Sequence, residues 1–171
     1  SRYLAGCVHL ALVFKHEPQA HGSFIPVDSD WAAQPDRYST HAGCEFVGGH
    51  LIETWVVTDQ VRALSSAEAE LYGIVDGSAR GIMTQNIYKE IQPDLHWSVT
   101  VASDSSAAIG ISSRSGVGKT RHIATRWLWV QDAVRDKLVT LRKIKGTENV
   151  ADIGTKALDP KHHQYLMQQL P

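Results

Sequence analysis

Four carboxylic acids stand at junctions between predicted elements of this 171-residue chain. Asp28 follows an apolar run, Glu70 lies one turn into a predicted helix, Asp104 separates a strand from a helix, and Asp152 follows a turn. All four have apolar or small neighbours, which exposed acids seldom have. If the four side chains cluster, their mutual repulsion raises their pKa values unless a cation balances the charge.

Divalent metal ions are the natural counter-charge for such a cluster. Hard oxygen ligands favour Mg²⁺ or Mn²⁺. Two such ions about 4 Å apart can activate water and stabilise the leaving oxygen in phosphodiester hydrolysis. Taken singly, each acid fits a helix cap or a surface position better, so only the set of four indicates a metal site.

Basic residues are concentrated in one stretch. Between Arg114 and Lys145 there are nine basic residues and only two acids, Asp132 and Asp136, a balance of nine minus two, or +7, in a chain of net charge −1. Phosphate backbones favour such a stretch because binding releases counterions. The alternative is a solvated helix face, the commoner explanation of a charge run.

Composition excludes several other classes of protein. The chain is 43% hydrophobic and 20% charged, and it contains no apolar run of the roughly 18 residues that a membrane span requires. No signal peptide is evident. Cys7 and Cys44 are expected to be free thiols. The histidines form no HExxH or related zinc pattern.

Hydrophobic periodicity predicts a mixed α/β fold. A Gly48–Gly49 pair between two β-rich runs indicates a hairpin, and Ser65 with Glu68 forms a capping box at a helix start. Gly73, Gly77 and Gly81 then share one helix face, which we expect to lie against a sheet. The predicted strands are Cys7–Phe14, Ser23–Val27, Ala42–Val47, Leu51–Val57, Ser98–Ser103 and Leu138–Ile144. One predicted helix follows the Ser65–Glu68 capping box, a short one is capped within Asp104–Ser106 and runs to about Ser112, and two more span His122–Asp136 and about Asn149–Lys156.

Short phrases around these residues resemble, in order and over nearly the whole chain, those of the ribonuclease H domain of copia-type retrotransposon polyproteins. Each phrase alone is weak evidence, and the ordered set is specific. The phrases are Arg2–Gly6, Val27–Ala32, Ser39–Gly43, Gly48–Trp55, Gln60 with Leu64–Leu71, Ser103–Ile109, Lys119–Ile123 and Gly146–Lys156.

The resemblance implies a ribonuclease H-like fold, a mixed five-stranded sheet with helices on both faces. It implies residues 1–20 as the tail of the connection to reverse transcriptase, 21–157 as the ribonuclease H domain and 158–171 as a C-terminal tail or helix. It also implies cleavage of the RNA strand of RNA–DNA hybrids, beside the reverse transcriptase domain of one polyprotein, in a cytoplasmic virus-like particle and not at a membrane.

Residue roles carry over by position. The resemblance gives catalysis and the binding of two Mg²⁺ ions, for which Mn²⁺ can substitute, to Asp28, Glu70, Asp104 and Asp152. It favours Glu70 over Glu68 because Glu70 directly precedes Leu71, and it leaves Asp30 in reserve. The residues expected to bind nucleic acid are Lys119, Arg121, His122 and Arg126.

The chain also departs from the family. Val57–Asp59 stands where the family often has Ser-Lys-Lys, and the loop before Asp152 lacks the histidine of cellular ribonucleases H, a role that His122 could fill in part. Trp127 could stack on bases, but it lies on an apolar stripe and fits the core better.

Two other functions compete with this one. A catalytically inactive or partner-dependent module could bind hybrids without cutting them. A phosphate-binding NTPase is suggested by Gly116–Thr120, but position 113 is a serine where a Walker A loop requires glycine.

Overall fold

A computed structural model of the chain describes residues 11, 13–15, 20–33, 35–116, 118, 122–123 and 125–170. Its centre is a five-stranded sheet in the order β3-β2-β1-β4-β5. β1 pairs antiparallel with β2 and parallel with β4, and β5 is parallel to β4. The strands are β1 (Gly22–Asp30), β2 (Thr40–Val47), β3 (His50–Thr58), β4 (Ser98–Ser103) and β5 (Thr140–Lys143).

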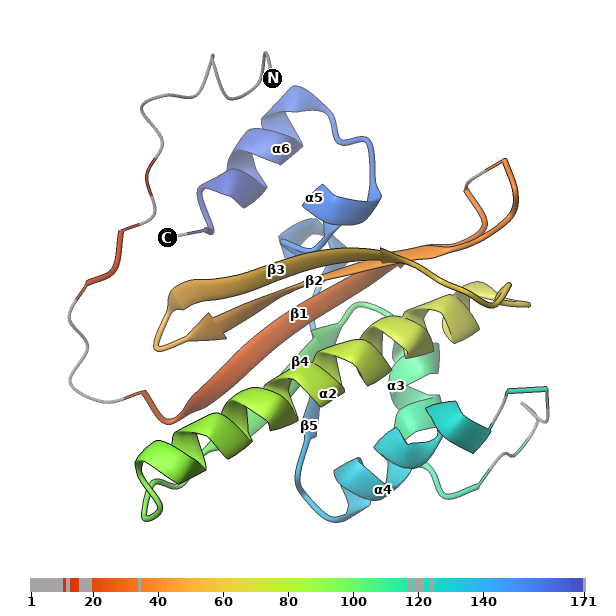
Figure 1. Cartoon of the computed structure of the whole chain (residues 1–171). Helices are drawn as coiled ribbons and strands as arrows, with labels where there is room; N and C mark the ends of the chain where they lie inside the picture. Colours follow the sequence, from red (N-terminus) through yellow and green to blue (C-terminus); the bar gives the residue numbers. More distant parts are fainter. Residues whose placement is uncertain are drawn as a thin grey trace.

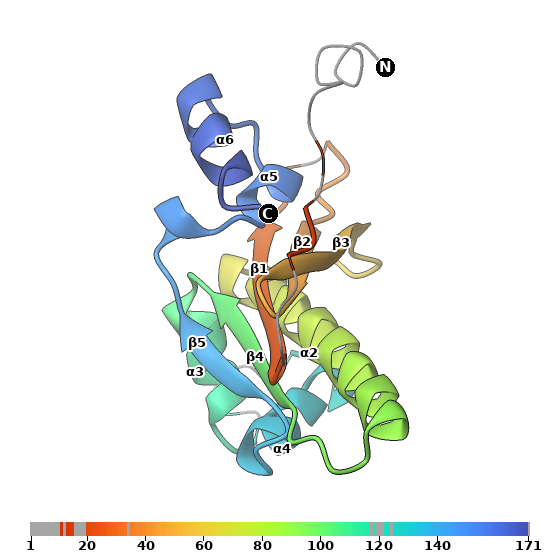
Figure 2. The same ribbon diagram turned by 90° about the vertical axis from the view of Figure 1, so that its left-hand side faces the viewer.

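Helices cover both faces of the sheet. In Figure 1, α2, α3 and α4 lie below the sheet and α5 and α6 above it. Figure 2 shows α5 and α6 gathered at the end of the sheet toward which β1 points. The predicted α/β architecture is therefore confirmed. The helices are α2 (Ser66–Ile91), α3 (Ser106–Ser113), α4 (Trp129–Arg135), α5 (Asp152–Thr155) and α6 (Pro160–Met167), with 3-10 turns η1 (Thr125–Trp127) and η2 (Gly146–Glu148).

Local sequence signals account for the hairpin and for the start of α2. Gly48 and Gly49 form the two-residue turn between β2 and β3, both with positive φ, as a tight hairpin requires. The Ser65 hydroxyl oxygen accepts a hydrogen bond from the Glu68 N–H at 3.2 Å and caps α2. The hairpin and the Ser65 cap are confirmed, whereas the Glu68 side chain accepts from the Leu64 N–H at 2.8 Å and does not complete the capping box with the Ser65 N–H.

The glycine face of α2 lies against the sheet, as predicted. A Cβ atom at Gly77 would lie 2.9 Å from Val27 Cγ1, and one at Gly81 would lie 2.5 Å from Val99 Cγ1. The helix therefore packs closely on β1 and β4. Ile25, Val27, Val99, Val101, Leu71 and Ile74 belong to this main core.

A smaller core lies on the opposite face, between the hairpin and the C-terminal helices. Leu166 of α6 is fully buried there with Cys44, a free thiol, Phe46 and Leu51. The division of the chain between residues 157 and 158 stays a prediction. None of the helices in the described part of the chain is long and apolar enough to cross a membrane.

Three predicted elements need correction. β1 continues to Asp30, so Asp28 lies within the strand, because pairing with β2 extends to Asp30–Thr40 after pairing with β4 stops at Pro26–Ala102. A single helix at His122–Asp136 is wrong, because the 3-10 turn η1 precedes α4. The last predicted helix is shorter and begins at Asp152.

The corrected segments have identifiable causes. The turn η1 places the Trp127 ring against Tyr72 of α2, with ring centroids 4.7 Å apart, and this partly buried contact agrees with the predicted core role. The Asn149 side chain donates to the Val27 carbonyl oxygen at 2.9 Å, which fixes the turn before α5. The predicted strand Cys7–Phe14 lies mostly outside the described residues, and described residues 11, 13 and 14 are not in a strand.

Candidate active site

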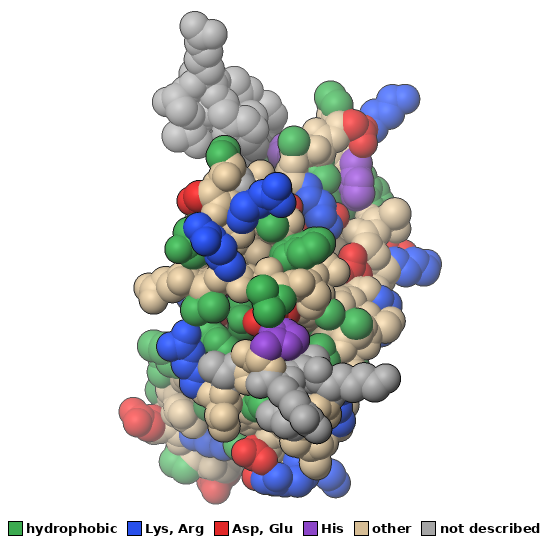
Figure 3. All heavy atoms as spheres, turned by 90° about the vertical axis from the view of Figure 1, so that its right-hand side faces the viewer, with side chains coloured by type: hydrophobic (Ala, Val, Ile, Leu, Met, Phe, Trp, Pro, Cys, Tyr) green, Lys and Arg blue, Asp and Glu red, His purple; other side chains and the backbone are tan. Residues whose placement is uncertain are grey.

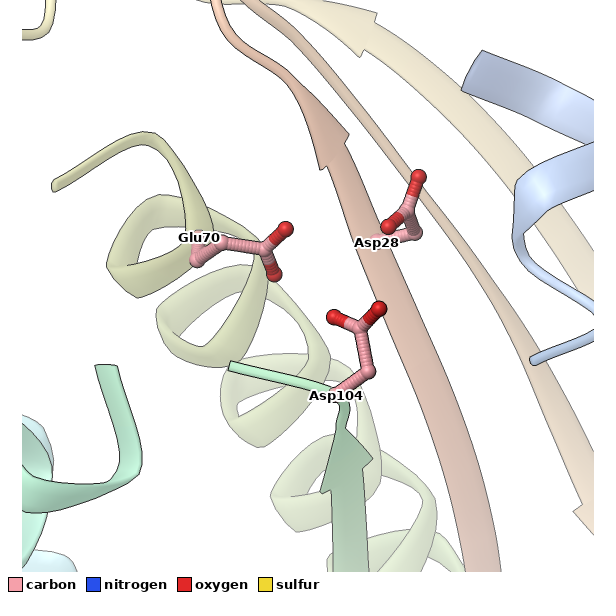
Figure 4. Close-up of side chains that lie close together, drawn as sticks. All are labelled: Asp28, Glu70 and Asp104. Carbon is pink, nitrogen blue, oxygen red and sulfur yellow. The ribbon is translucent and has the colours of Figure 1, made fainter. Parts of the chain in front are cut away.

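Three of the four predicted acids meet where β4 ends. Asp28 lies on β1, Glu70 on the first turns of α2, and Asp104 directly after β4. Each offers a carboxylate oxygen, and these oxygens lie within 4.8 Å of one another. Figure 4 shows the three side chains converging from the strand, the helix and the strand end. Because β1 continues past the end of β4, Asp28 and Asp104 can both reach this point.

The cluster has the electrostatics of a site built for a cation. Burial raises the pKa of Glu70 to about 8, and the nearby Asp28 and Asp104 carboxylates add to this rise. Burial likewise raises the pKa of Asp28 to about 6, and repulsion from Asp152 adds to it. Because the donors are all carboxylate oxygens, Mg²⁺ or Mn²⁺ fits the cluster better than a softer metal.

Neighbouring groups orient the Glu70 and Asp28 carboxylates. Glu70 accepts hydrogen bonds from the Ser29 N–H at 3.4 Å and from the Ser103 hydroxyl at 3.3 Å. The Asp28 Oδ2 atom accepts a short hydrogen bond from the Thr155 hydroxyl. Neither Ser103 nor Thr155 was predicted to have a role, because hydroxyl residues at such positions are also ordinary helix and strand termini.

Asp152 lies beside the cluster and is linked to it through Lys156. The Lys156 Nζ atom is 3.0 Å from Asp28 Oδ1 and 3.0 Å from Asp152 Oδ1. Although partial burial lowers it, the two carboxylates raise the pKa of Lys156 above its usual value. Among the described residues, the acids with oxygens within 4.8 Å of one another are Asp28, Glu70 and Asp104, so Asp152 is not brought into this group.

Glu68 and Glu70 have different surroundings. Glu68 accepts hydrogen bonds from the Tyr72 hydroxyl at 2.5 Å and from the Leu64 N–H at 2.8 Å, and it lies 3.2 Å from His122 Nε2. These contacts make Glu68 an anchor for the segment that contains His122. The placement of Glu70 in the cluster agrees with the choice made from the sequence, although the catalytic roles of the four acids stay predictions. Asp30, the reserve candidate, lies outside the group of three.

The described basic residues of the stretch from Arg114 to Lys145 lie on more than one side of the sheet. Arg135 pairs with both Asp132 and Asp136. Arg126 lies over the Trp127 ring on the α2 side of the sheet, whereas Arg142 lies over Phe24 on the α6 side. Figure 3 shows basic side chains scattered over one face without gathering in a single patch, with acidic and histidine side chains near its centre.

Of the predicted nucleic-acid contacts, His122 and Arg126 are exposed, and Lys119 and Arg121 lie outside the described residues. These four contacts stay predictions.

Comparisons with known proteins relate the chain to a retrotransposon polyprotein. No protein-family model matches the chain. Over 99% of its length it is 30% identical to the retrovirus-related Pol polyprotein from transposon TNT 1-94 of Nicotiana tabacum, and it spans 13% of that polyprotein's length.

Solved structures with similar folds include two ribonuclease H proteins. One is LC11-RNase H1, in a crystal structure of its complex with an RNA/DNA hybrid. Its TM-score is 0.51 at 14% sequence identity, and the match covers 77% of this chain and 92% of that one. The solution structure of the RNase H domain of prototype foamy virus has a TM-score of 0.51 and 10% identity, over 89% and 93% of the two chains. At these identities the likeness concerns the fold.

Proposed function

We propose that this ribonuclease H-like domain, which is related to a segment of a retrotransposon Pol polyprotein, is a metal-dependent nuclease. Its proposed activity is hydrolysis of the RNA strand of RNA–DNA hybrids. One observation carries the proposal: oxygens of Asp28, Glu70 and Asp104 lie within 4.8 Å of one another at the carboxyl end of β4. Ligands commonly bind at strand ends of this kind in α/β sheets.

Each acid has a defined part in the proposed mechanism. Asp28, Glu70 and Asp104 would hold the two divalent ions, and Asp152 would complete the set from the Lys156 side. Bound there, such ions supply an activated water and a counter-charge for the leaving oxygen. Ser103 and the Ser29 N–H hold Glu70 in position, and Thr155 does the same for Asp28. The expected products carry a 5′-phosphate and a 3′-hydroxyl.

Substrate contacts are proposed for the residues beside the cluster. His122, held near Glu68, and Arg126, held over Trp127, are exposed and could contact backbone phosphates together with Lys119 and Arg121. Discrimination of RNA would rest on 2′-hydroxyl contacts and groove shape, with little sequence preference. By its relationship to the polyprotein, the domain would act beside a copia-type reverse transcriptase in a cytoplasmic virus-like particle.

Cleavage of a hybrid labelled separately on each strand tests this function. We expect the RNA strand alone to be cut with Mg²⁺ or Mn²⁺ and neither strand to be cut with EDTA. Asp104→Asn should abolish cutting. Asp94→Asn, the same change at an exposed position in the loop after α2, should not affect it.

Failure to cut by a folded, cation-loaded protein would rule out autonomous catalysis. Hybrid binding without cutting would then favour an inactive or partner-dependent module. Addition of the reverse transcriptase part would separate these two possibilities.

A further inference from the structure

The Lys156 side chain places a positive charge between two of the proposed ligands. Its ammonium nitrogen lies 3.0 Å from an oxygen of Asp28 and 3.0 Å from an oxygen of Asp152. Both carboxylates are almost fully buried, with side-chain exposures of 1% and 7%, whereas the lysine side chain is 40% exposed. The chain thus supplies its own counter-charge beside Asp28 and Asp152.

Both oxygens of Asp28 are engaged in this arrangement. Oδ2 accepts from the Thr155 hydroxyl and Oδ1 accepts from Lys156. A divalent cation that ligates Asp28 needs one of these oxygens. The Thr155 hydroxyl is joined to α5 by a short side chain with one rotatable bond, so it moves over a shorter distance than a lysine ammonium group. Lys156 is the helix C-cap and has a long flexible stem that can carry its ammonium group into water.

We infer that Lys156 is a positioning residue whose ammonium group holds Asp28 and Asp152 together and leaves Asp28 when a divalent cation binds there. This inference rests on the proposed function for the identity of the ligands. An ammonium group 3.0 Å from a ligand oxygen repels an incoming dication, so lysine contact and cation binding compete. Release of Lys156 would also free Asp152 to join the other three acids.

Mn²⁺ binding to the metal-free protein tests the competition between Lys156 and the cation without any need for catalysis. It can be measured by calorimetry and by electron paramagnetic resonance of free Mn²⁺. Lys156→Met should bind Mn²⁺ at least about fivefold more tightly than the parent, the lower end of usual coupling between sites. Lys89→Met removes the same charge at an exposed position in the last turn of α2 and should leave the affinity unchanged. Equal or weaker binding by Lys156→Met would overturn the inference.

A second measurement uses the parent protein, so it does not depend on the variant folding. With ¹³C-labelled lysine, the Lys156 Cε signal should move toward that of an exposed lysine as Mg²⁺ is added, with the same midpoint as cation binding. A signal unchanged at saturating Mg²⁺ would mean that Lys156 keeps its contacts, and absence of cation binding would mean that there is no competition. Either result would overturn the inference.

The two proposals fail in different ways. Competition between Lys156 and the cation in a protein that cuts no hybrid would refute autonomous nuclease activity and leave the role of Lys156 intact. Cation-dependent cutting with unchanged Mn²⁺ affinity in Lys156→Met would refute only the role of Lys156.

Discussion

The hydroxyl group of Ser103, the last residue of β4, donates a hydrogen bond to Glu70 Oε2 on α2 over 3.3 Å. The other oxygen of Glu70 accepts from the Ser29 N–H on β1 at 3.4 Å. The carboxylate is therefore fixed between β1, which carries Asp28, and β4, which ends just before Asp104. Burial and repulsion from these two acids raise the pKa of Glu70 to about 8. A negative charge here is unfavourable without a cation.

Glu70→Gln should separate catalysis from stability. We expect hybrid cleavage to fall by more than about 100-fold, since changes to groups behind metal ligands already cost about 10- to 100-fold. Because the pKa of Glu70 is raised from the usual 4.5 to about 8 in the folded protein, stability is lost as the pH rises from about 4.5 to about 8, and the loss is complete above 8. In EDTA at pH 9, urea denaturation should therefore show the variant to be more stable than the parent, by more than about 1 kcal/mol.

Glu68→Gln is the matched control, two residues away on the same helix. It weakens contacts to Tyr72 and His122, so we expect the free energy of unfolding to fall by about 1–2 kcal/mol. Divalent-cation affinity should be unchanged. If Glu68→Gln loses the cation and Glu70→Gln keeps it, the assignment of the two glutamates is wrong.

The sequence was most informative where a local signal decides the structure. The Gly48–Gly49 turn and the Ser65 cap depend on the residues at those positions alone, so they could be predicted. A cluster of Asp28, Glu70, Asp104 and Asp152 was predicted from their apolar or small neighbours at element junctions and from ordered phrases that resemble a known family. The structure brings the first three together and leaves Asp152 beside them.

Contacts between distant residues could not be predicted in the same way. Lys156 and Thr155 contact Asp28 from 128 and 127 residues away along the chain, and no local pattern indicates such a contact. The apolar stripe that suggested one helix at His122–Asp136 is shared between a 3-10 turn and α4. Periodicity cannot distinguish these arrangements, since packing of Trp127 on Tyr72 decides between them.

A buried histidine should make stability fall at high pH. His41 on β2 contacts Asp59 over 2.8 Å and Asp76 on α2 over 3.2 Å. Although burial lowers it, these two carboxylates raise the pKa of His41 to about 9 from the usual 6.5. The stabilisation is therefore fully present below pH 6.5 and is lost as the pH rises through 9. The loss should reach about 2–3 kcal/mol.

Urea denaturation of the parent and of His41→Gln between pH 6 and 10 measures this contribution. The stability difference between the two proteins should be largest at pH 6 and should shrink toward pH 10. Other titrating groups act equally on both proteins and cancel in the difference. A difference that stays constant with pH would show that His41 is not charged in the folded protein.

The close packing of α2 on the sheet predicts the effect of a small substitution. A Cβ atom at Gly81 would lie 2.5 Å from Val99 Cγ1 and 2.6 Å from Ile25 Cδ1. Gly81→Ala should destabilise the protein by about 1–3 kcal/mol through overpacking, although alanine favours the helix by about 1 kcal/mol. Gly110→Ala on α3 has no atom within 4 Å and should be neutral or stabilising in thermal melts. Equal melting temperatures for the two variants would contradict close packing at Gly81.

Gly146, the first residue of η2, constrains the position of Asp104. A Cβ atom there would lie 2.8 Å from Asp104 Oδ2, so Gly146→Ala should turn that carboxylate away from Asp28 and Glu70. We expect hybrid cleavage to fall by about 10- to 100-fold, since small misplacements near reacting groups have effects of that size. Divalent-cation affinity, measured by calorimetry, should fall with it.

The melting temperature in EDTA should hardly change, because Asp104 is only partly buried. Gly110→Ala controls for the added methyl group, and unaltered cation affinity in Gly146→Ala would mean that Asp104 does not bind the metal from this position.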